Sequence, residues 1–267
     1  MNIGFIGAGN MAGAMIRGLR SHGFSADEVA AYDVDAAKLQ ALADDCGMTV
    51  ATAADELIRR SDVVVLSVKP QMLETALSAL PAVFAEKKPL VISIAAGTSL
   101  ETLAGLCGAG LRIIRVMPNL NATVGEAMSA YCGNAAVTDA DKQAAETVLS
   151  SFGKVVSLPE DQFAAYSALA GCSPAYTMLY MDALIKVGQA HGIPLDTAKA
   201  VVAQAVLGTA KLLAESGDST DVWIDRVCSP GGTTIEGIKS LRADNVSDAV
   251  QRAAKASIAR DIELSQK

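Results

Sequence analysis

Two glycine-containing segments carry residues whose types and spacing could do chemistry. Near the start, Gly7-Ala8-Gly9-Asn10-Met11-Ala12 lies between a short apolar run and a helical pattern. Far along the chain, residues 228–237 are CSPGGTTIEG, with Pro230, Gly231 and Gly232 together among helix-forming residues. Glycines before a helix have no side chain to cover the backbone N–H groups of the helix N-terminus, and the helix dipole adds partial positive charge at that end. Both segments therefore predict sites that hold anionic groups.

The first segment has the form G-x-G-x-x-A, with a predicted strand before it and a predicted helix after it. This is the context of a dinucleotide-binding turn. Gly7 permits the tight turn, Gly9 lets a pyrophosphate approach the backbone, and Ala12 lets helix and strand pack closely. We therefore predict that a dinucleotide cofactor binds here. A glycine turn with a structural role alone is the alternative.

Asp33 follows the second predicted strand, at the position expected of a ribose-binding acid. Its carboxylate could accept hydrogen bonds from both adenosine ribose hydroxyls, and it would repel a 2′-phosphate. No arginine lies between Asp33 and Lys38 to neutralise that phosphate, and we expect Lys38 to lie too far along the helix to do so. The segment therefore favours NADH over NADPH. The alternative is that Asp33 only caps the following turn.

Three other predicted strands end on unusual residues, namely Ser67-Val68-Lys69-Pro70, Ala95-Ala96-Gly97 and Met117-Pro118-Asn119. Ligands of open α/β sheets lie beyond the carboxyl ends of the strands. The small residues at 95–97 leave room for a flat ring, Lys69 supplies charge, and Asn119 supplies an amide. Each segment alone could be an ordinary turn. Their coincidence at one sheet edge predicts a cofactor crevice.

The glycine pair of the second segment precedes a predicted helix. Thr233 and Glu236 have the spacing of a T-x-x-E capping box, which predicts that the helix begins at Thr234. Gly231 and Gly232 would expose consecutive N–H groups in front of the helix dipole, and such a nest binds anions. An ordinary turn between helices is the alternative.

The sequence offers no clear side-chain base. His22 and His191 both lie away from the predicted strand ends, and no G-x-S-x-G elbow occurs. A carbinol dehydrogenase needs a base to accept the hydroxyl proton. The absence of a candidate favours a reaction that needs little proton chemistry, such as hydride addition to a protonated imine.

The elements that must position these residues change in type along the chain. Strand-like runs alternate with helical patterns over residues 1–159, which predicts an α/β domain with a Rossmann-type doubly wound sheet. The predicted strands are 2–6, 29–32, 63–67, 90–94, 112–116 and 154–158, and the predicted helices between them are 10–22, 36–46, 71–80 and 99–107. Residues 160–267 predict an all-helical domain, with long helices at 161–188, 195–215 and 246–264. This domain has more apolar surface than it can bury alone, which predicts a subunit interface.

Composition excludes several classes of function. The net charge of −7 argues against nucleic acid as a partner. Five scattered cysteines without a C-x-x-C pair, and only two histidines, argue against disulfides and a metal site. The apolar runs are shorter than a membrane span, and we see no signal peptide. We expect a soluble cytoplasmic protein with free thiols.

Seven motifs resemble those of the pyrroline-5-carboxylate reductase family, over nearly the whole length. They are FIGAGNMA near the start, SVKP at 67–70, SIAAG at 93–97, RVMPN at 115–119, SPAY at 173–176, GTAKLL at 208–213 and VCSPGGTT at 227–234. The last is the most specific. The resemblance implies reduction of 1-pyrroline-5-carboxylate to L-proline by hydride transfer from NADPH or NADH to the cyclic imine, the last step of proline biosynthesis. It also implies an N-terminal Rossmann domain and a helical dimerisation domain, with dimers assembling further in many members.

The resemblance also implies contacts, position by position. The cofactor-binding residues would be Ile6, Gly7, Ala8, Gly9, Asn10, Met11, Ser67, Val68, Lys69, Pro70, Ala95, Ala96 and Gly97, to which we add Asp33. The substrate-binding residues would be Ser229, Gly231, Gly232, Thr233 and Thr234, to which we add Asn119. Thr234 would hydrogen-bond near the substrate nitrogen and is the catalytic candidate.

The sequence departs from the family pattern at three places. Leu120-Asn121 stands where Thr-Pro is usual, and Cys172-Ser173 where Ser-Gly is common. Many members have an arginine or small hydroxyl residues where this chain has Asp33, so the family favours NADPH while this sequence favours NADH. We expect both cofactors to work.

Two other functions share the predicted first half. A β-hydroxyacid dehydrogenase needs a Lys-x-x-x-Asn pair on the long helix after the domain boundary, and Lys186 has no asparagine four residues on. A non-enzymatic dinucleotide sensor would need no substrate loop, so the SPGGTT segment argues against it.

Overall fold

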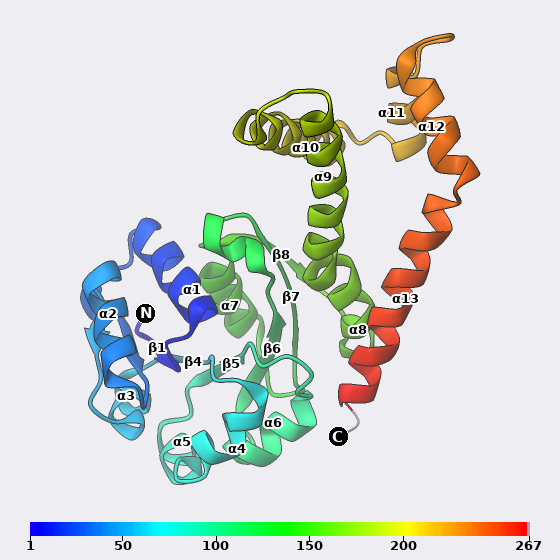
Figure 1. The fold of residues 1–267 in the computed structure, drawn as a ribbon. Helices are drawn as coiled ribbons and strands as arrows, with labels where there is room; N and C mark the ends of the chain where they lie inside the picture. The colour runs from blue at the N-terminus through cyan, green and yellow to red at the C-terminus, as the bar shows by residue number, and fades with distance from the viewer. Residues whose placement is uncertain (266–267) are drawn as a thin grey trace. The chain divides into compact units, whose positions relative to one another are not determined.

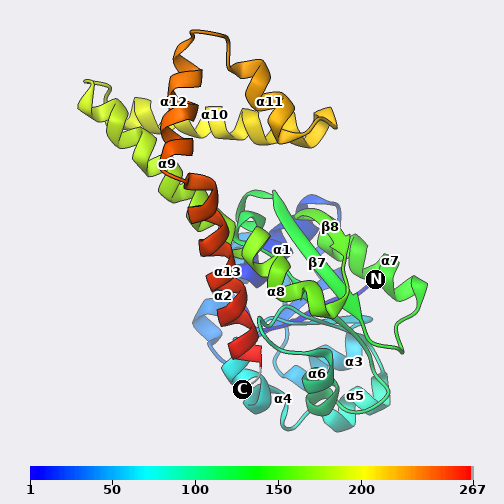
Figure 2. The same ribbon diagram turned by 90° about the vertical axis from the view of Figure 1, so that its right-hand side faces the viewer.

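The computed structural model describes residues 1–265 of the chain. These form two compact units, drawn in Figures 1 and 2. The first comprises Met1–Gly171 together with the C-terminal segment from Ile258, and the second comprises Cys172–Ser257. The predicted division of the chain into domains at 159/160 stays a prediction, and the compact units divide later, after Gly171.

An eight-stranded sheet forms the centre of the first unit, in the order β3-β2-β1-β4-β5-β6-β7-β8. Neighbouring strands are parallel except β6 and β7, which are antiparallel. The strands are β1 Ile3–Ile6, β2 Val29–Tyr32, β3 Thr49–Val50, β4 Val63–Leu66, β5 Leu90–Ser93, β6 Arg112–Met117, β7 Ala127–Gly133 and β8 Gly153–Ser157. The predicted doubly wound sheet is confirmed.

Helices cover both faces of this sheet, as Figure 1 shows with α1 and α7 on one side and α4, α5 and α6 on the other. The helices are α1 Asn10–Ser21, α2 Ala36–Cys46, α3 Ala54–Arg60, α4 Leu73–Leu77, α5 Pro81–Lys87, α6 Leu100–Cys107, α7 Asp139–Ser150 and α8 Phe163–Tyr166. Short 3-10 turns lie at Ala26–Glu28, Pro70–Met72, Leu120–Val124 and Glu160–Gln162. Alternate residues of β4 enter two separate cores: Val63 and Val65 join one, Val64 and Leu66 the other. Because both faces are buried, these strands are continuous apolar runs.

Two strands of the sheet are absent from the sequence prediction. One is the two-residue β3, and the other is β7, whose sequence is AMSAYCG. Alanine and glycine are depleted in strands, and β7 contains no β-branched residue. It forms because it pairs with β6 on one side and β8 on the other. Pairing with neighbouring strands, rather than its own composition, therefore makes this segment a strand.

The predicted helix 161–188 is also wrong in detail. A π-helical segment, η5 Ser167–Cys172, separates α8 from α9. A π-helix widens the backbone spiral for a turn or so and is often found at functional places. The apolar periodicity runs across it without a break, which is why the sequence pattern suggests one helix.

The second unit is built from helices, with no strand among its residues Cys172–Ser257. Its elements are α9 Ser173–Ala190, α10 Leu195–Ser216, α11 Thr220–Val227, α12 Thr233–Ala243 and α13 Val246–Ser265, the last of which continues into the first unit. Helices α9 and α10 pack against each other. Many large apolar side chains of this unit are exposed, among them Met178, Leu179, Val187, Val201 and Leu207.

Helix α10 is apolar and long enough to cross a membrane by length and composition alone, with a mean hydropathy of 1.2 over its most apolar stretch. Only 11% of that stretch is buried within the chain.

Candidate functional site

The carboxyl ends of β1, β4, β5 and β6 surround one crevice of about 520 Å³. Its lining comprises Gly9, Asn10, Met11, Lys38, Ser67, Val68, Lys69, Pro70, Ile94, Ala95, Ala96, Met117 and Pro118. The structure thus brings together the glycine turn and the three unusual strand ends, as the sequence predicts. Ile6, Gly7 and Ala8 are buried behind this surface. Lys38 and Ile94 are lining residues that the sequence prediction does not include.

The two glycines of the turn have different reasons to be glycine. Gly7 has φ +106°, and a Cβ there would lie 2.9 Å from the backbone carbon and oxygen of Ser67. The Ser67 hydroxyl donates to the carbonyl oxygens of Ile6 and Gly7 at 3.0 and 2.8 Å. Gly9 has φ −72° and ψ 177°, which any residue can adopt, and a Cβ there would meet nothing within 4 Å. Gly7 is therefore required by the fold, whereas Gly9 keeps open a space that the fold does not use.

Helix α1 begins at this open space. Gly9 is its N-cap, no side chain caps it, and its first turn has no acidic residue. The first-turn N–H groups of a helix have no partner within the helix, and they attract anions. Asn10 and Met11 at this end line the crevice. A phosphate group is the ligand that fits.

Asp33 lies directly after β2 and is tied into the base of the turn. Its Oδ2 accepts the N–H of Ala8 at 2.7 Å and the ammonium of Lys38 at 3.4 Å, and its Oδ1 accepts the N–H of Asp35 at 3.0 Å. Burial is the largest single influence on the Asp33 pKa and raises it. The hydrogen bonds from Asp35 and Ala8 and the charge of Lys38 together outweigh burial and lower the pKa below its ordinary value. Asp33 is therefore ionised at neutral pH.

The position of Lys38 corrects the sequence expectation that it lies too far away to matter. Lys38 is in the first turn of α2, and side chains of a helix lean toward its N-terminus. Its long stem therefore reaches back to Asp33, and it lines the crevice. The signal that could have revealed this contact is a lysine in the first turn of the helix after β2.

Asn119 is only 6% exposed, and both ends of its amide have protein partners. Its Nδ2 donates to the carbonyl oxygen of Ala170 at 3.0 Å, and its Oδ1 accepts the N–H of Met128 at 3.3 Å. Asn119 thus ties the end of β6 to β7 and to the π-helical segment. It does not line the crevice, and its predicted contact with substrate stays a prediction.

Gly97 lies beyond Ala96 with φ +72°, and a Cβ there would meet nothing within 4 Å. Ala95 is buried and Ala96 is exposed at the crevice. Gly97 is not among the residues that line the crevice, while Ala95 and Ala96 line it with small side chains, as a flat ring would require.

The second glycine segment forms a tight turn in the helical unit. Gly231 has φ +71°, and the N–H of Gly232 donates to the carbonyl oxygen of Ser229 at 3.0 Å. Proline at the second position and a left-handed glycine at the third are the marks of a type II turn. An added Cβ on Gly232 would lie 2.5 Å from the Ser229 hydroxyl oxygen. Pro230, Gly231 and Gly232 therefore each meet a requirement of this turn.

The predicted capping box is wrong. Helix α12 begins at Thr233, its N-cap is Gly232, and no side chain caps it. Glu236 instead forms an ion pair with Lys239 at 2.7 Å. The N–H groups of the first turn are thus left without a side-chain acceptor, although Thr233 has the sequence of a cap. The N-terminus of α12 therefore has no side-chain cap, like that of α1.

Other reactive groups have ordinary structural roles. The Nδ1 atoms of His22 and His191 lie 2.9 and 3.2 Å from the carbonyl oxygens of Gly18 and Val187, and both rings are exposed at helix ends. All five cysteines are free. The described residues contain no group of histidine, cysteine and acidic side chains able to hold a metal ion.

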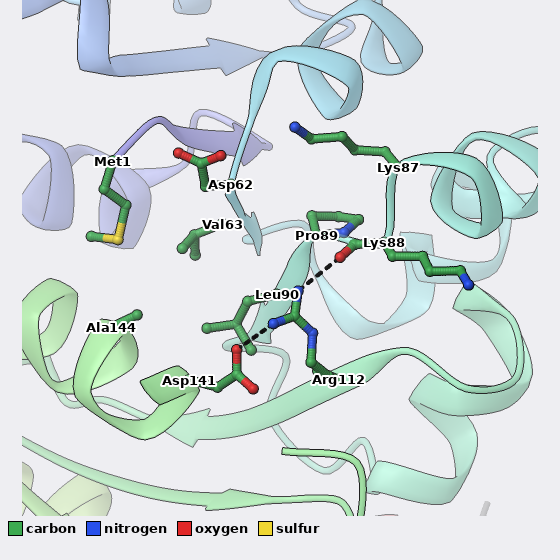
Figure 3. Close-up of a pocket in the computed structure, with 10 residues that line it drawn as sticks. All are labelled: Met1, Asp62, Val63, Lys87, Lys88, Pro89, Leu90, Arg112, Asp141 and Ala144. Atoms are coloured by element: carbon green, nitrogen blue, oxygen red, sulfur yellow. Dashed lines mark hydrogen bonds and ion pairs between the residues drawn. The ribbon is translucent and has the colours of Figure 1, made fainter. Parts of the chain in front are cut away.

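A second hollow, of about 320 Å³, lies at the amino ends of β4, β5 and β6 (Figure 3). Arg112 crosses it, donating to Asp141 at 2.7 Å and to the carbonyl oxygen of Lys88 at 2.8 Å. The Asp62 carboxylate accepts the N–H of Asn2 at 2.9 Å. These partners give the polar groups structural roles, and ligands of such sheets bind at the opposite edge.

Two family models match the chain. Residues 160–264 match the model described as pyrroline-5-carboxylate reductase dimerisation. Residues 2–97 match the model described as NADP oxidoreductase, coenzyme F420-dependent. The matches coincide with the helical segment and with the first part of the sheet, respectively.

Characterised proteins resemble the chain over its full length. The pyrroline-5-carboxylate reductase of Methanosarcina acetivorans is 38% identical, over 99% of this chain and 98% of that protein. A pyrroline-5-carboxylate reductase structure from Coxiella burnetii is 33% identical, with a TM-score of 0.94 over 100% of this chain and 99% of the other. The Plasmodium falciparum pyrroline carboxylate reductase, solved with NADP bound, is 26% identical, with a TM-score of 0.88 over 99% and 98% of the two chains.

Proposed function

The chain belongs to the pyrroline-5-carboxylate reductase family, and from that premise we propose which of its residues perform the reaction. The enzyme reduces 1-pyrroline-5-carboxylate to L-proline, the last step of proline biosynthesis, with NADPH or NADH as the reductant. When bound, the cofactor supplies a hydride. The tasks left to the protein are to hold the cofactor, to hold the substrate carboxylate and to orient the imine.

The crevice at the strand ends fits a dinucleotide. Gly9 leaves open space in front of the bare first turn of α1, where N–H groups would hold the pyrophosphate. Lys69 adds a positive charge beside it, and the small side chains of Ala95 and Ala96 leave room for the nicotinamide ring. Lys38 lines the crevice and its ion-pair partner Asp33 directly follows β2, where the adenosine ribose is expected.

The substrate carboxylate would bind at the start of α12. The observation that carries this proposal is that α12 begins at Thr233, with Gly232 as its N-cap, without a side-chain cap and directly after a type II turn. In the same unit, α11 is capped by Ser219, whose hydroxyl accepts the N–H of Val222. Bare N–H groups and the helix dipole suit a carboxylate. The Ser229, Thr233 and Thr234 side chains are exposed beside them.

Thr234 would orient the imine by hydrogen bonding near its nitrogen. A protonated C=N⁺ is electrophilic without a further acid, so hydride addition needs no side-chain base. Both histidines lie at exposed helix ends, in agreement with this chemistry. The contribution of the protein is therefore position and charge, which are large terms in catalysis.

The enzyme is a homodimer that associates through its helical segment. The exposed apolar side chains of α9 and α10 suit such an interface, and this use accounts for the apolar composition of α10. We assign the enzyme to the cytoplasm, because five free thiols suit a reducing compartment.

Thr234→Ala tests the assignment of the substrate loop. We expect kcat/KM for the pyrroline to fall about 10- to 100-fold, the effect of one hydrogen bond to a charged group. The dissociation constant of NADPH should change less than about twofold, and Thr234→Ser should recover most of the activity. The matched control is Thr220→Ala, an exposed threonine at the start of α11. An equal loss in cofactor affinity would show that Thr234 does not act on the substrate.

A further inference from the structure

Lys38 and Asp33 form an ion pair at the edge of the cofactor crevice. The Lys38 ammonium lies 3.4 Å from Asp33 Oδ2. The Asp33 side chain is 13% exposed and that of Lys38 is 45% exposed. The carboxylate is thus fixed in the protein, while the lysine reaches it from the crevice side and can leave it.

The hydrogen bonds of Asp33 limit what else it can accept. A carboxylate has about four acceptor positions, two on each oxygen. Oδ2 already accepts from Ala8 and Lys38, and Oδ1 accepts from Asp35. One position remains, on Oδ1. A ribose diol that binds one hydroxyl to each carboxylate oxygen therefore requires Lys38 to move away.

The charge of the pair differs from that of Asp33 alone. An isolated carboxylate after β2 would repel a 2′-phosphate, which is the argument for NADH from the sequence. Lys38 neutralises that charge, and its ammonium can turn from Asp33 to a phosphate on a flexible stem. Asp35 is also acidic, but its Oδ1 caps α2 by accepting the N–H of Lys38 at 3.1 Å.

We propose that Lys38 is the residue that admits the 2′-phosphate of NADPH, and that Asp33 serves the ribose hydroxyls of NADH when Lys38 swings aside. The pair makes the enzyme accept both cofactors. This inference depends on the proposed function only through the cofactor crevice, because it concerns the adenosine end and needs no turnover.

The test measures binding of two adenosine ligands to the full-length protein by calorimetry. The ligand 2′,5′-ADP carries a 2′-phosphate and a 5′-phosphate, and AMP carries only the 5′-phosphate, so the two ligands differ in the 2′-phosphate alone. Lys38→Gln should weaken binding of 2′,5′-ADP about tenfold, as expected for a partly exposed charged contact, and leave binding of AMP within about twofold. Lys69→Gln, in the same crevice, should weaken binding of both ligands alike.

Lys142→Gln is the control for loss of a surface charge. Its side chain is 49% exposed and paired with Asp139 at 2.9 Å, comparable to Lys38, but it lies on α7 outside the crevice. Binding of both ligands should be unchanged. If Lys38→Gln binds 2′,5′-ADP as tightly as the unchanged protein, the role of Lys38 is refuted while the cofactor site stands. If the unchanged protein binds neither ligand, the cofactor site itself is refuted, and Lys38 with it.

Discussion

Replacing Gly9 by alanine should separate cofactor binding from folding. The backbone of Gly9 is extended, and an added Cβ would touch nothing within 4 Å. Alanine is a poorer N-cap than glycine, but it also has less conformational freedom to lose on folding. These effects oppose each other, so the free energy of unfolding should change by less than about 1 kcal/mol.

The effect on the ligand should be much larger. The methyl group would occupy the space through which a pyrophosphate reaches the N–H groups at the start of α1. Each hydrogen bond to a charged group contributes about 1.5–3 kcal/mol. The loss of one such bond raises the dissociation constant of the cofactor about 10- to 100-fold. Calorimetric titration with NADPH, beside a thermal melt of the same sample, measures both quantities.

Gly7→Ala is the matched control, two residues away in the same turn. Its φ of +106° and the 2.9 Å approach to the Ser67 backbone predict a loss of at least about 2 kcal/mol of stability. The reasoning is refuted if Gly9→Ala binds NADPH as tightly as the unchanged enzyme. It is equally refuted if Gly9→Ala melts as early as Gly7→Ala.

Two further substitutions test other parts of the account. Asp33→Ser should raise kcat/KM for NADPH relative to NADH, because it removes the carboxylate and frees Lys38; no gain for NADPH in steady-state assays would contradict the proposed role of this ion pair. Ser129→Ala should raise the free energy of unfolding in urea by about 1 kcal/mol, because the Ser129 hydroxyl is buried with no hydrogen-bond partner among the described residues. A loss of stability would show that the hydroxyl has a partner after all.

The sequence predicts most of the sheet because its central strands are apolar runs of strand length. The crevice could be predicted because Gly9, Lys69 and Ala96 follow such runs directly, and parallel strands end at one edge. The strand β7 could not be predicted, because pairing with β6 and β8 rather than its own composition makes it a strand.

Other errors come from local alternatives that only the folded chain distinguishes. Thr233 and Glu236 have the spacing of a capping box, but the type II turn before them makes Gly232 the N-cap. The position of Lys38 along the helix suggests that it lies too far from Asp33, but its side chain leans back toward the helix start and reaches the carboxylate. The backbone geometry of the turn sets the N-cap of α12, and the direction of the Lys38 side chain brings it to Asp33.

The most direct test is to incubate the purified enzyme with 1-pyrroline-5-carboxylate and either NADPH or NADH. Loss of the reduced-nicotinamide absorbance and formation of L-proline are measured together. The account predicts turnover with both cofactors, with one L-proline formed per cofactor oxidised. Absence of L-proline with either cofactor would contradict it.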